Sequence, residues 1–247
     1  DAGVEQVGQD AELLGARGNL YKAEGRIPAA LDDLRKAVSL APDSARHAAN
    51  YGNALLAGGE IDEAVVALRR SLALDPSLAE THLTLGNALK ARGDLDEAVL
   101  EYQRALDLKP GFAEAAFNIG NLRREEGLYG AAISAYRQAL AIRPEYGDAR
   151  WNLSLALLGN GELAAGLDEY EWRWRDGDEL RIPQVHGIPA WAGEPVEGRR
   201  VLVWREQGLG DELLFLTCVP DLIARGARVT LVVNPRLVGM VARSFPG

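Results

Sequence analysis

Residues 79–112 read AETHLTLGNALKARGDLDEAVLEYQRALDLKPGF, and residues 113–146 read AEAAFNIGNLRREEGLYGAAISAYRQALAIRPEY. The two segments carry glycine, asparagine, alanine, tyrosine and proline at matching positions, 34 residues apart. The same register extends in both directions, with further blocks that start at Ala11, Ala45 and Gly147. A fixed period of this length predicts one supersecondary unit that is repeated along the chain.

Small residues and a proline define the unit inside each block. Glycine at position 8 and alanine at position 20 let two helices approach closely. Proline at position 32 ends the second helix, because it lacks an N–H and disfavours helical geometry in the preceding residue. Another glycine supplies the turn between the helices. The residues at these positions are Gly18, Gly52, Gly86 and Gly120; Ala30, Ala64, Ala98 and Ala132; Pro42, Pro76, Pro110 and Pro144; and the turn residues Gly25, Gly59, Gly93, Gly127 and Gly161.

This pattern resembles the tetratricopeptide repeat family, whose units have the same length and the same small-residue positions. The resemblance covers residues 11–175 as four full repeats and a fifth capping repeat, after an N-terminal extension at residues 1–10. It implies a mainly α fold, a right-handed α-solenoid whose inner groove binds a protein or an extended peptide. Position 4, often aromatic in the family, departs from the pattern with Leu14, Ala48, His82, Ala116 and Arg150.

Asparagines recur at two positions on the first helix of each block. Position 9 holds Asn19, Asn53, Asn87 and Asn121, and position 6 holds Asn50, Asn118 and Asn152, with Ala16 and Thr84 in the other copies. We call these seven asparagines the asparagine ladder. Positions 6 and 9 are three residues apart, so their side chains share one helix face. Each amide offers donors and acceptors that match the backbone of an extended peptide.

The asparagine ladder has two interpretations. Asn50, Asn118 and Asn152 are similar to the asparagines in the repeat superhelix of O-linked N-acetylglucosamine transferases, which implies polypeptide binding in the inner groove. Asparagine at position 9 equally fits a role in packing between helices and in satisfying local polar groups. We favour groove function at position 6, and both interpretations stay open at position 9.

The composition changes after residue 175. Residues 176–200 contain Pro183, Pro189 and Pro195 among several glycines, which predicts a linker. Residues 201–247 predict strand, helix, strand and helix, an incomplete Rossmann-like α/β segment. The turn after the first strand does not match the dinucleotide-binding fingerprint, because Leu213 occupies the position of the third glycine. It does not match a phosphate-binding P-loop either, because no Gly-Lys-Ser/Thr follows.

Residues 185–247 resemble the opening of heptosyltransferase-like glycosyltransferases of the two-lobed GT-B fold, found in bacterial proteins behind tetratricopeptide repeats. The matching residues include Trp191-Ala-Gly193, Gly198-Arg-Arg-Val-Leu-Val-Trp204 and Glu206-Gln-Gly-Leu-Gly-Asp211. The resemblance places Asp211 at the catalytic cleft, with a proposed general-base role. The acceptor-side loop then consists of Glu206, Gln207, Gly208 and Gly210. Asp211 equally fits the ordinary role of an aspartate that caps the following helix.

Charge and composition exclude several classes of function. The chain of 247 residues has a formal net charge of -9 and a sequence pI near 5.0, and phosphate binding needs clustered Lys and Arg, so we exclude nucleic acid. Cys218 is the only cysteine and the histidines lie far apart, so we expect no metal site and no cofactor. We expect no membrane span, because no run approaches about 20 apolar residues, and a cytoplasmic location, because a signal peptide is lacking.

Three hypotheses about function remain open. The preferred one is a peptide-binding module attached to an incomplete glycosyltransferase-like domain. The second is a piece of a larger sugar transferase, with nucleotide-sugar bound only in a longer chain, and the third is a scaffold. The chain begins at Asp1 and ends at Gly247, so we expect a segment of a longer protein. The aromatic run from Tyr170 to Arg175 is expected to cover the end of the solenoid and to pack on the tail.

Overall fold

The structure is a computed structural model that describes residues 10–174, 191, 193–204 and 216–245. It contains two compact units, residues 1–176 and residues 177–247. Among the described residues, no helix combines the length and the apolar character needed to cross a bilayer.

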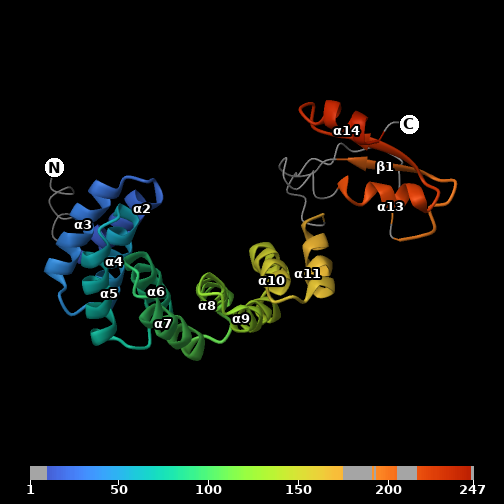
Figure 1. The fold of residues 1–247 in the computed structure, drawn as a ribbon. Coiled ribbons are helices and arrows are strands. Elements are labelled where there is room, and N and C mark those ends of the chain that lie inside the picture. Colours follow the sequence, from blue (N-terminus) through green and yellow to red (C-terminus); the bar gives the residue numbers. More distant parts are fainter. Residues whose placement is uncertain (1–9, 175–190, 192, 205–215, 246–247) are drawn as a thin grey trace. The chain divides into compact units, whose positions relative to one another are not determined.

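The first unit is a row of five helical hairpins, coloured from blue to yellow in Figure 1. Each hairpin pairs a first helix with a second helix of the same 34-residue block. In chain order the elements are α2 (Ala11–Ala23), α3 (Ile27–Leu40), α4 (Ala45–Gly58), α5 (Ile61–Leu74), α6 (Ala79–Arg92), α7 (Leu95–Leu108), α8 (Ala113–Glu125), α9 (Tyr129–Ile142), α10 (Gly147–Gly159), α11 (Leu163–Tyr170) and the 3-10 turn η1 (Glu171–Trp174). The mainly helical solenoid is therefore confirmed.

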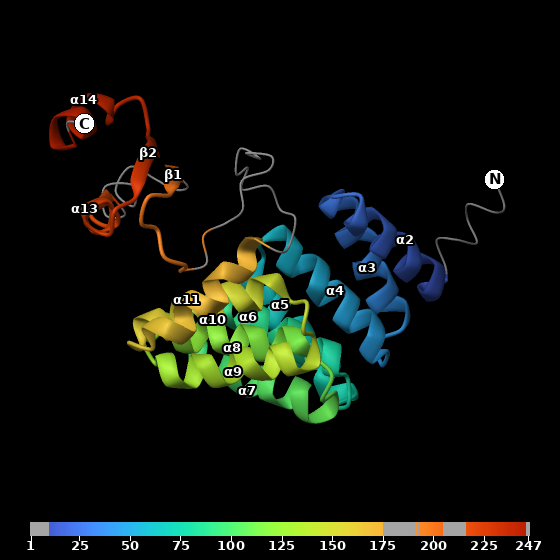
Figure 2. The same cartoon turned by 90° about the vertical axis from the view of Figure 1, so that its right-hand side faces the viewer.

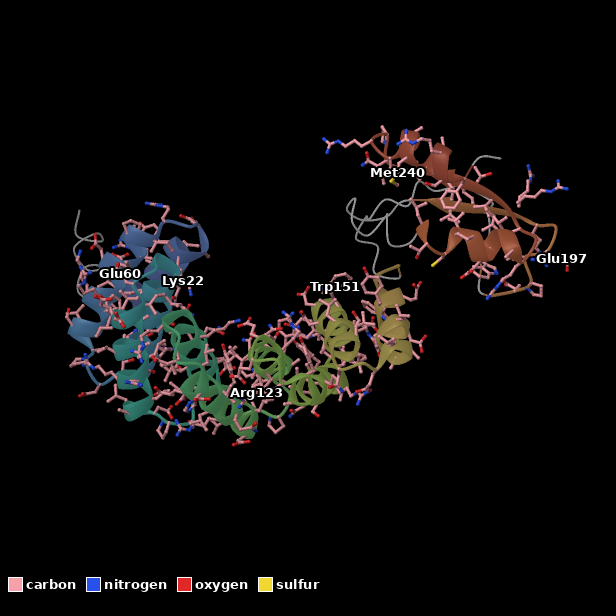
Figure 3. All side chains as sticks on the ribbon, in the orientation of Figure 1. Lys22, Glu60, Arg123, Trp151, Glu197 and Met240 are labelled. Carbon is pink, nitrogen blue, oxygen red and sulfur yellow. The ribbon has the colours of Figure 1, made fainter. Side chains whose placement is uncertain are left out.

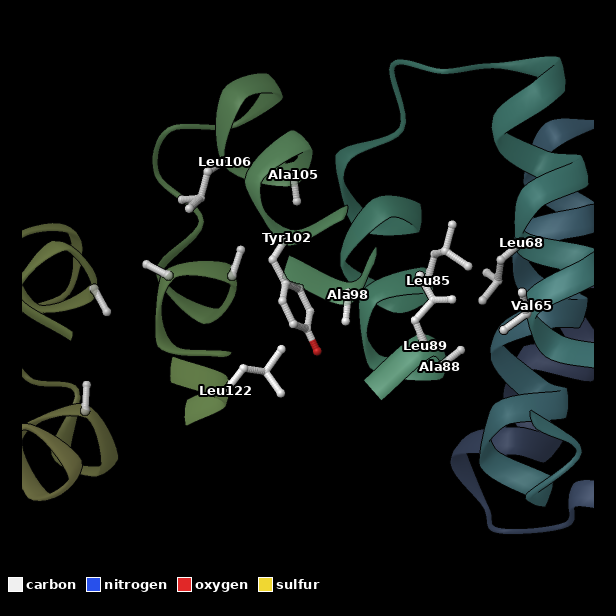
Figure 4. Packing of buried hydrophobic residues seen from close by; sticks show 14 residues of the cluster. Val65, Leu68, Leu85, Ala88, Leu89, Ala98, Tyr102, Ala105, Leu106 and Leu122 are labelled. Atoms are coloured by element: carbon white, nitrogen blue, oxygen red, sulfur yellow. The ribbon is translucent and has the colours of Figure 1, made fainter. Parts of the chain in front are cut away.

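The close approach of the two helices follows from the glycine at position 8. A Cβ atom at Gly86 would lie 2.5 Å from Cε1 of the Tyr102 ring, which is fully buried. Gly18 has the same relationship to Leu34, with a distance of 2.6 Å from the hypothetical Cβ to Cγ. Figure 4 shows the Tyr102 ring inside this core, between Leu122 and Ala98. Glycine thus leaves the space that the large residue at position 24 fills.

The turns between the helices also follow the prediction. Gly25, Gly59, Gly93, Gly127 and Gly161 all have a positive φ, between 75° and 97°. Such left-handed geometry after a helix favours glycine because other residues carry a Cβ atom that clashes there.

The first helices lie along the inner side of the curved row, and the second helices lie along its outer side (Figure 1; Figure 2 gives the view turned by 90°). Consecutive first helices also contact one another, as α2 contacts α4, α4 contacts α6 and α8 contacts α10. A residue on the exposed face of a first helix therefore lies in the inner groove, next to its counterparts from neighbouring repeats.

The fifth repeat has a shortened second helix. Helix α11 has 8 residues, against 14 in each of α3, α5, α7 and α9, and it continues into the turn η1. Tyr170 lies against Trp151 of α10 with ring centroids 5.1 Å apart, and Arg150 lies over the Trp172 ring at 4.9 Å. Part of the expected aromatic cover is thus present. The side chains of Trp174 and Arg175 lie outside the described residues.

The second unit contains two parallel strands, β1 (Arg200–Trp204) and β2 (Arg228–Val232), with Val201 opposite Val229. The helix α13 (Val219–Ala224) lies between them in sequence, and α14 (Val238–Ser244) follows. The order of strand, helix, strand and helix agrees with the sequence prediction. A pair of strands is less than a doubly wound sheet, however, so a Rossmann-like lobe is not shown by the described residues.

Candidate functional site

The inner face of the first helices carries the asparagine ladder. Asn87 is exposed, and the other six asparagines are half-buried. They lie on the first helices α2, α4, α6, α8 and α10, as expected from positions 6 and 9. On α4 and α8, which carry two each, the two asparagines are three residues apart. Figure 3 shows the side chains of this surface, with Lys22 on α2 and Trp151 on α10 labelled near its two ends.

Two ladder asparagines have a buried tyrosine as a partner. The Tyr102 hydroxyl donates to Oδ1 of Asn87 at 2.8 Å, and the Tyr136 hydroxyl donates to Oδ1 of Asn121 at 2.8 Å. Burial raises the pKa of both tyrosines, so each hydroxyl remains a proton donor well above neutral pH. These contacts support the local role for Asn87 and Asn121, which sequence reasoning left open. The available signal was tyrosine at position 24 in these same two blocks.

The other asparagines differ in their partners. Nδ2 of Asn118 donates across the repeat boundary to Oδ1 of Asn87 at 3.1 Å, and Nδ2 of Asn152 donates to the Asp148 carbonyl at 2.9 Å. In the first two repeats leucine replaces tyrosine at position 24, and no hydroxyl reaches the asparagine. Within the part of the chain that the structure describes, three of the ladder amides have no side-chain hydrogen bond: Asn19, Asn50 and Asn53.

Most acidic residues of the first helices are neutralised by cations. Glu12 lies 2.5 Å from Arg46, Glu80 lies 2.8 Å from Lys109, and Glu114 pairs with Arg143. The charged residues of the described first helices that form no ion pair are Lys22, Arg124 and Asp148. Burial lowers the pKa of Lys22, and Nε of Arg124 is buried without a hydrogen-bond acceptor. Two of the three unpaired charges on these helices are therefore positive, although the chain as a whole is acidic.

A second group of polar residues lies between helices of the same repeat, at positions 4 and 23. Nδ1 of His82 lies 2.6 Å from Oε2 of Glu101, and both side chains are buried. Arg150 and Glu169 occupy the same two positions in the fifth repeat and lie 3.1 Å apart. In the third and fifth repeats, the polar residue at position 4 is thus matched by an acidic residue 19 positions later.

Hollows also recur on the outer side, between consecutive second helices. One of about 600 Å³ is lined by Leu72, His82, Glu101 and Arg104 among others. One of about 450 Å³ occupies the equivalent place one repeat earlier, where Ala48 and Ala67 replace His82 and Glu101. Their linings mix apolar side chains with charges of both signs.

The candidates in the second unit lie outside the described residues. These are Asp211, Glu206, Gln207, Gly208 and Gly210. Among the described residues, no group of three or more potential metal ligands is present.

Comparison with known proteins identifies the repeats. The sequence model of the TPR repeat matches residues 52–91, 86–123 and 120–161, and a second tetratricopeptide repeat model matches residues 11–44. Protein FlbA of Caulobacter vibrioides is 35% identical over 97 residues, which are 36% of this chain. The match spans only 16% of the length of that curated relative.

Several solved structures share the fold of the first unit. The MamA protein has a TM-score of 0.62 at 21% identity and covers 74% of this chain and 100% of its own. YrrB, described as a TPR protein with an unusual peptide-binding site, has a TM-score of 0.58 at 21% identity, covering 71% of this chain and 91% of its own. PilW, a type IV pilus biogenesis factor, has a TM-score of 0.66 at 19% identity, covering 74% and 85%. The matched repeats, the observed hairpins and these structures agree, and the chain belongs to the tetratricopeptide repeat family.

Proposed function

We propose that residues 11–174 bind an extended segment of another protein along the inner face of the first helices. The observation that carries this proposal is the row of ladder amides on five successive first helices. Within the described structure, the side-chain amides of Asn19, Asn50 and Asn53 form no hydrogen bond, so their N–H and C=O groups are available to a ligand. An extended peptide presents N–H and C=O groups at regular intervals, and amides can pair with both.

The comparisons support binding of a protein or peptide, the activity expected of this family. YrrB, which shares the fold of the repeats, has a peptide-binding site of its own. We extend a peptide-binding role to this chain, and the use of asparagines for it is our own proposal. The single cysteine, Cys218, which is free and exposed, supports our further proposal that the protein is cytoplasmic.

The test replaces Asn50, Asn118 and Asn152 together with Ala. Peptides selected from a random display library on the unmodified chain serve as probes in titrations. Each lost neutral hydrogen bond is worth roughly 0.5–1.5 kcal/mol, so affinity is expected to fall at least about tenfold while the fold is retained. Asn160→Ala is the matched control, because Nδ2 of Asn160 contacts Glu162 in the turn after α10. Unchanged affinity in the triple variant would show that the peptide binds elsewhere.

A second candidate function concerns the second unit. The parallel pair of β1 and β2 supports the proposal that this unit begins a glycosyltransferase-like lobe, with the segment from Glu206 to Asp211 following the carboxyl end of β1. In open α/β sheets, ligands bind at this end of the strands. In a longer chain that includes a nucleotide-sugar-binding lobe, Asp211→Asn is expected to abolish sugar transfer and to leave peptide binding intact. Full transfer activity in the Asp211→Asn variant would show that Asp211 has no catalytic role and only caps the following helix.

A further inference from the structure

Arg124 is a cation on the inner face of the fourth repeat that faces no carboxylate. It forms no ion pair with any described residue, and its Nε is buried without an acceptor. The neighbouring carboxylate, Glu125, lies instead 3.6 Å from Nζ of Lys90. The Arg124 guanidinium lies close to the Tyr136 hydroxyl and lowers the pKa of Tyr136. Burial has the larger effect and raises the pKa of this tyrosine. The positive charge of this guanidinium is therefore not neutralised within the described structure, and a carboxylate from outside could pair with its remaining nitrogens.

Two ladder amides of the third and fourth repeats have a fixed orientation. Oδ1 of Asn87 accepts from the Tyr102 hydroxyl at 2.8 Å and from Nδ2 of Asn118 at 3.1 Å. These two bonds use both lone pairs of that oxygen, so only the Nδ2 donors of Asn87 remain. Oδ1 of Asn121 accepts from the Tyr136 hydroxyl in the same way, one helical turn before Arg124. Asn87 therefore presents only donors and Asn121 mainly donors, whereas Asn19 and Asn53, which have no tyrosine partner, can rotate and present either group.

We propose that Tyr102 and Tyr136 act as positioning residues that turn Asn87 and Asn121 into donors, and that this donor site, together with Arg124, binds an acidic side chain within an extended peptide. The proposal rests on the function proposed above and names the chemistry of its partner. A carboxylate has two oxygens and about four acceptor positions, which match a guanidinium and two amide donors.

The position of the site favours an acidic side chain inside the peptide over a C-terminal carboxylate. Ladder amides lie on both sides of Arg124 along the row, with Asn50 and Asn53 on α4 and Asn152 on α10. A peptide that uses all of them passes Arg124 and continues. Its carboxylate at this point then comes from Asp or Glu.

The experiment selects peptides from a random display library on the full chain and measures the affinity of the selected peptides by fluorescence polarisation. Enrichment of Asp or Glu at one position is expected. Changing that residue to its amide isostere should weaken binding about tenfold, because a charge-assisted hydrogen bond becomes a neutral one. Arg124→Gln should remove this preference for acid over amide. Capping the C-terminus of the peptide as an amide should have no effect.

Tyr102→Phe combined with Tyr136→Phe tests the positioning role. The change frees Oδ1 of both asparagines, so the amides can rotate and accept from the amide isostere. The affinity ratio between the acidic peptide and its isostere should fall toward one. A purely structural effect would weaken both peptides equally and leave the ratio unchanged. Tyr146→Phe is the control, because the Tyr146 hydroxyl has no hydrogen bond within the described structure.

The outcomes separate the two proposals. Selected peptides without an acidic preference that still lose affinity in the Asn50, Asn118 and Asn152 variant would overturn the acidic site and retain the groove. A requirement for the free C-terminus would overturn the internal carboxylate. An unchanged acid-to-amide ratio in the double tyrosine variant would overturn the positioning role. Failure to select any peptide would overturn the proposed function, and the acidic site with it.

Discussion

His82 and Glu101 are 19 residues apart in the sequence, and their side chains meet inside the third repeat at 2.6 Å. The second ring nitrogen of His82 contacts the Pro76 carbonyl at 3.1 Å, and Glu101 also accepts from Arg104 at 2.5 Å. The same two positions hold alanines in the second and fourth repeats, Ala48 with Ala67 and Ala116 with Ala135. The third repeat therefore has a polar pair at the place where both of its neighbouring repeats have a small pair.

This relationship predicts strong coupling between the two residues. Each of His82→Ala and Glu101→Ala should lower the free energy of unfolding by about 1–3 kcal/mol, because a buried polar group loses its partner. The double variant should lose less than the sum of the two, since it recreates the alanine pair of the neighbouring repeats. Urea denaturation of the four proteins measures the coupling. Additive losses would show that the contact contributes nothing of its own.

The glycine at position 8 gives a second prediction. Gly86→Ala should lower the free energy of unfolding by about 1–3 kcal/mol, because its Cβ overlaps the buried Tyr102 ring. Gly130→Ala is the matched control, since it lies in α9 with no atom within 4 Å of the added carbon and with no positive φ. Alanine should stabilise the helix there by about 0.5–1 kcal/mol. Thermal or urea unfolding of both variants checks the contrast, and equal effects would contradict the packing of Tyr102 against Gly86.

The buried tyrosines predict loss of stability in alkali. The pKa values of Tyr102, Tyr136 and Tyr146 are raised, chiefly by burial, so the unfolded chain ionises these groups at lower pH than the folded chain. Their contribution to stability is fully present below about pH 10, the ordinary tyrosine pKa, and is lost as the pH rises above it. Urea midpoints measured from pH 8 to pH 11 should fall less steeply in Tyr102→Phe than in the unmodified protein. Identical slopes would mean that Tyr102 ionises equally easily in both states.

The end of the solenoid gives a fourth prediction. Trp172→Ala removes the ring under Arg150, so amide hydrogen exchange in α10 and α11 should accelerate. Exchange in α2 to α5 should stay unchanged, because each repeat contacts mainly its neighbours. Tyr21→Ala is the mirror-image control, since Tyr21 packs under Arg26 in the first repeat at 4.2 Å. Its effect should remain in α2 and α3. A change spread evenly over all repeats in either variant would show global rather than local opening.

Much of the solenoid could be predicted from the sequence because its determinants recur at fixed spacing. The glycines at positions 8 and 15, alanine at position 20 and proline at position 32 each act within one hairpin, and four or more copies agree. The ladder asparagines were placed correctly on the first helices for the same reason. Their hydrogen bonds were not predicted, because the partner of Asn87 is Tyr102, on the other helix of the hairpin. The partner of His82 was missed for a similar reason, since Glu101 lies on that same second helix.

The second unit was less predictable because its elements do not repeat. Each strand occurs only once in the sequence, so no repeated pattern supports its assignment. The order of the strands in the sheet depends on the pairing of β1 with β2 across an intervening helix. The sequence order of elements was sufficient for a parallel pair. It could not supply the extent of the sheet, and Asp211 with its neighbouring loop remains a prediction from resemblance.

The inter-repeat ion pairs have a consequence for how the length of the array can change. Arg46 of the second repeat pairs with Glu12 of the first, 34 residues earlier. Arg92 of the third repeat lies 3.8 Å from Asp62 of the second, and Glu125 of the fourth lies 3.6 Å from Lys90 of the third. Every such pair joins a repeat only to the one before it. A block can therefore be duplicated or excised in steps of 34 residues, because none of these pairs reaches beyond the adjacent repeat. The length of the groove is therefore set by the number of repeats. The number of peptide residues that the groove covers can change in evolution through duplication or loss of whole repeats.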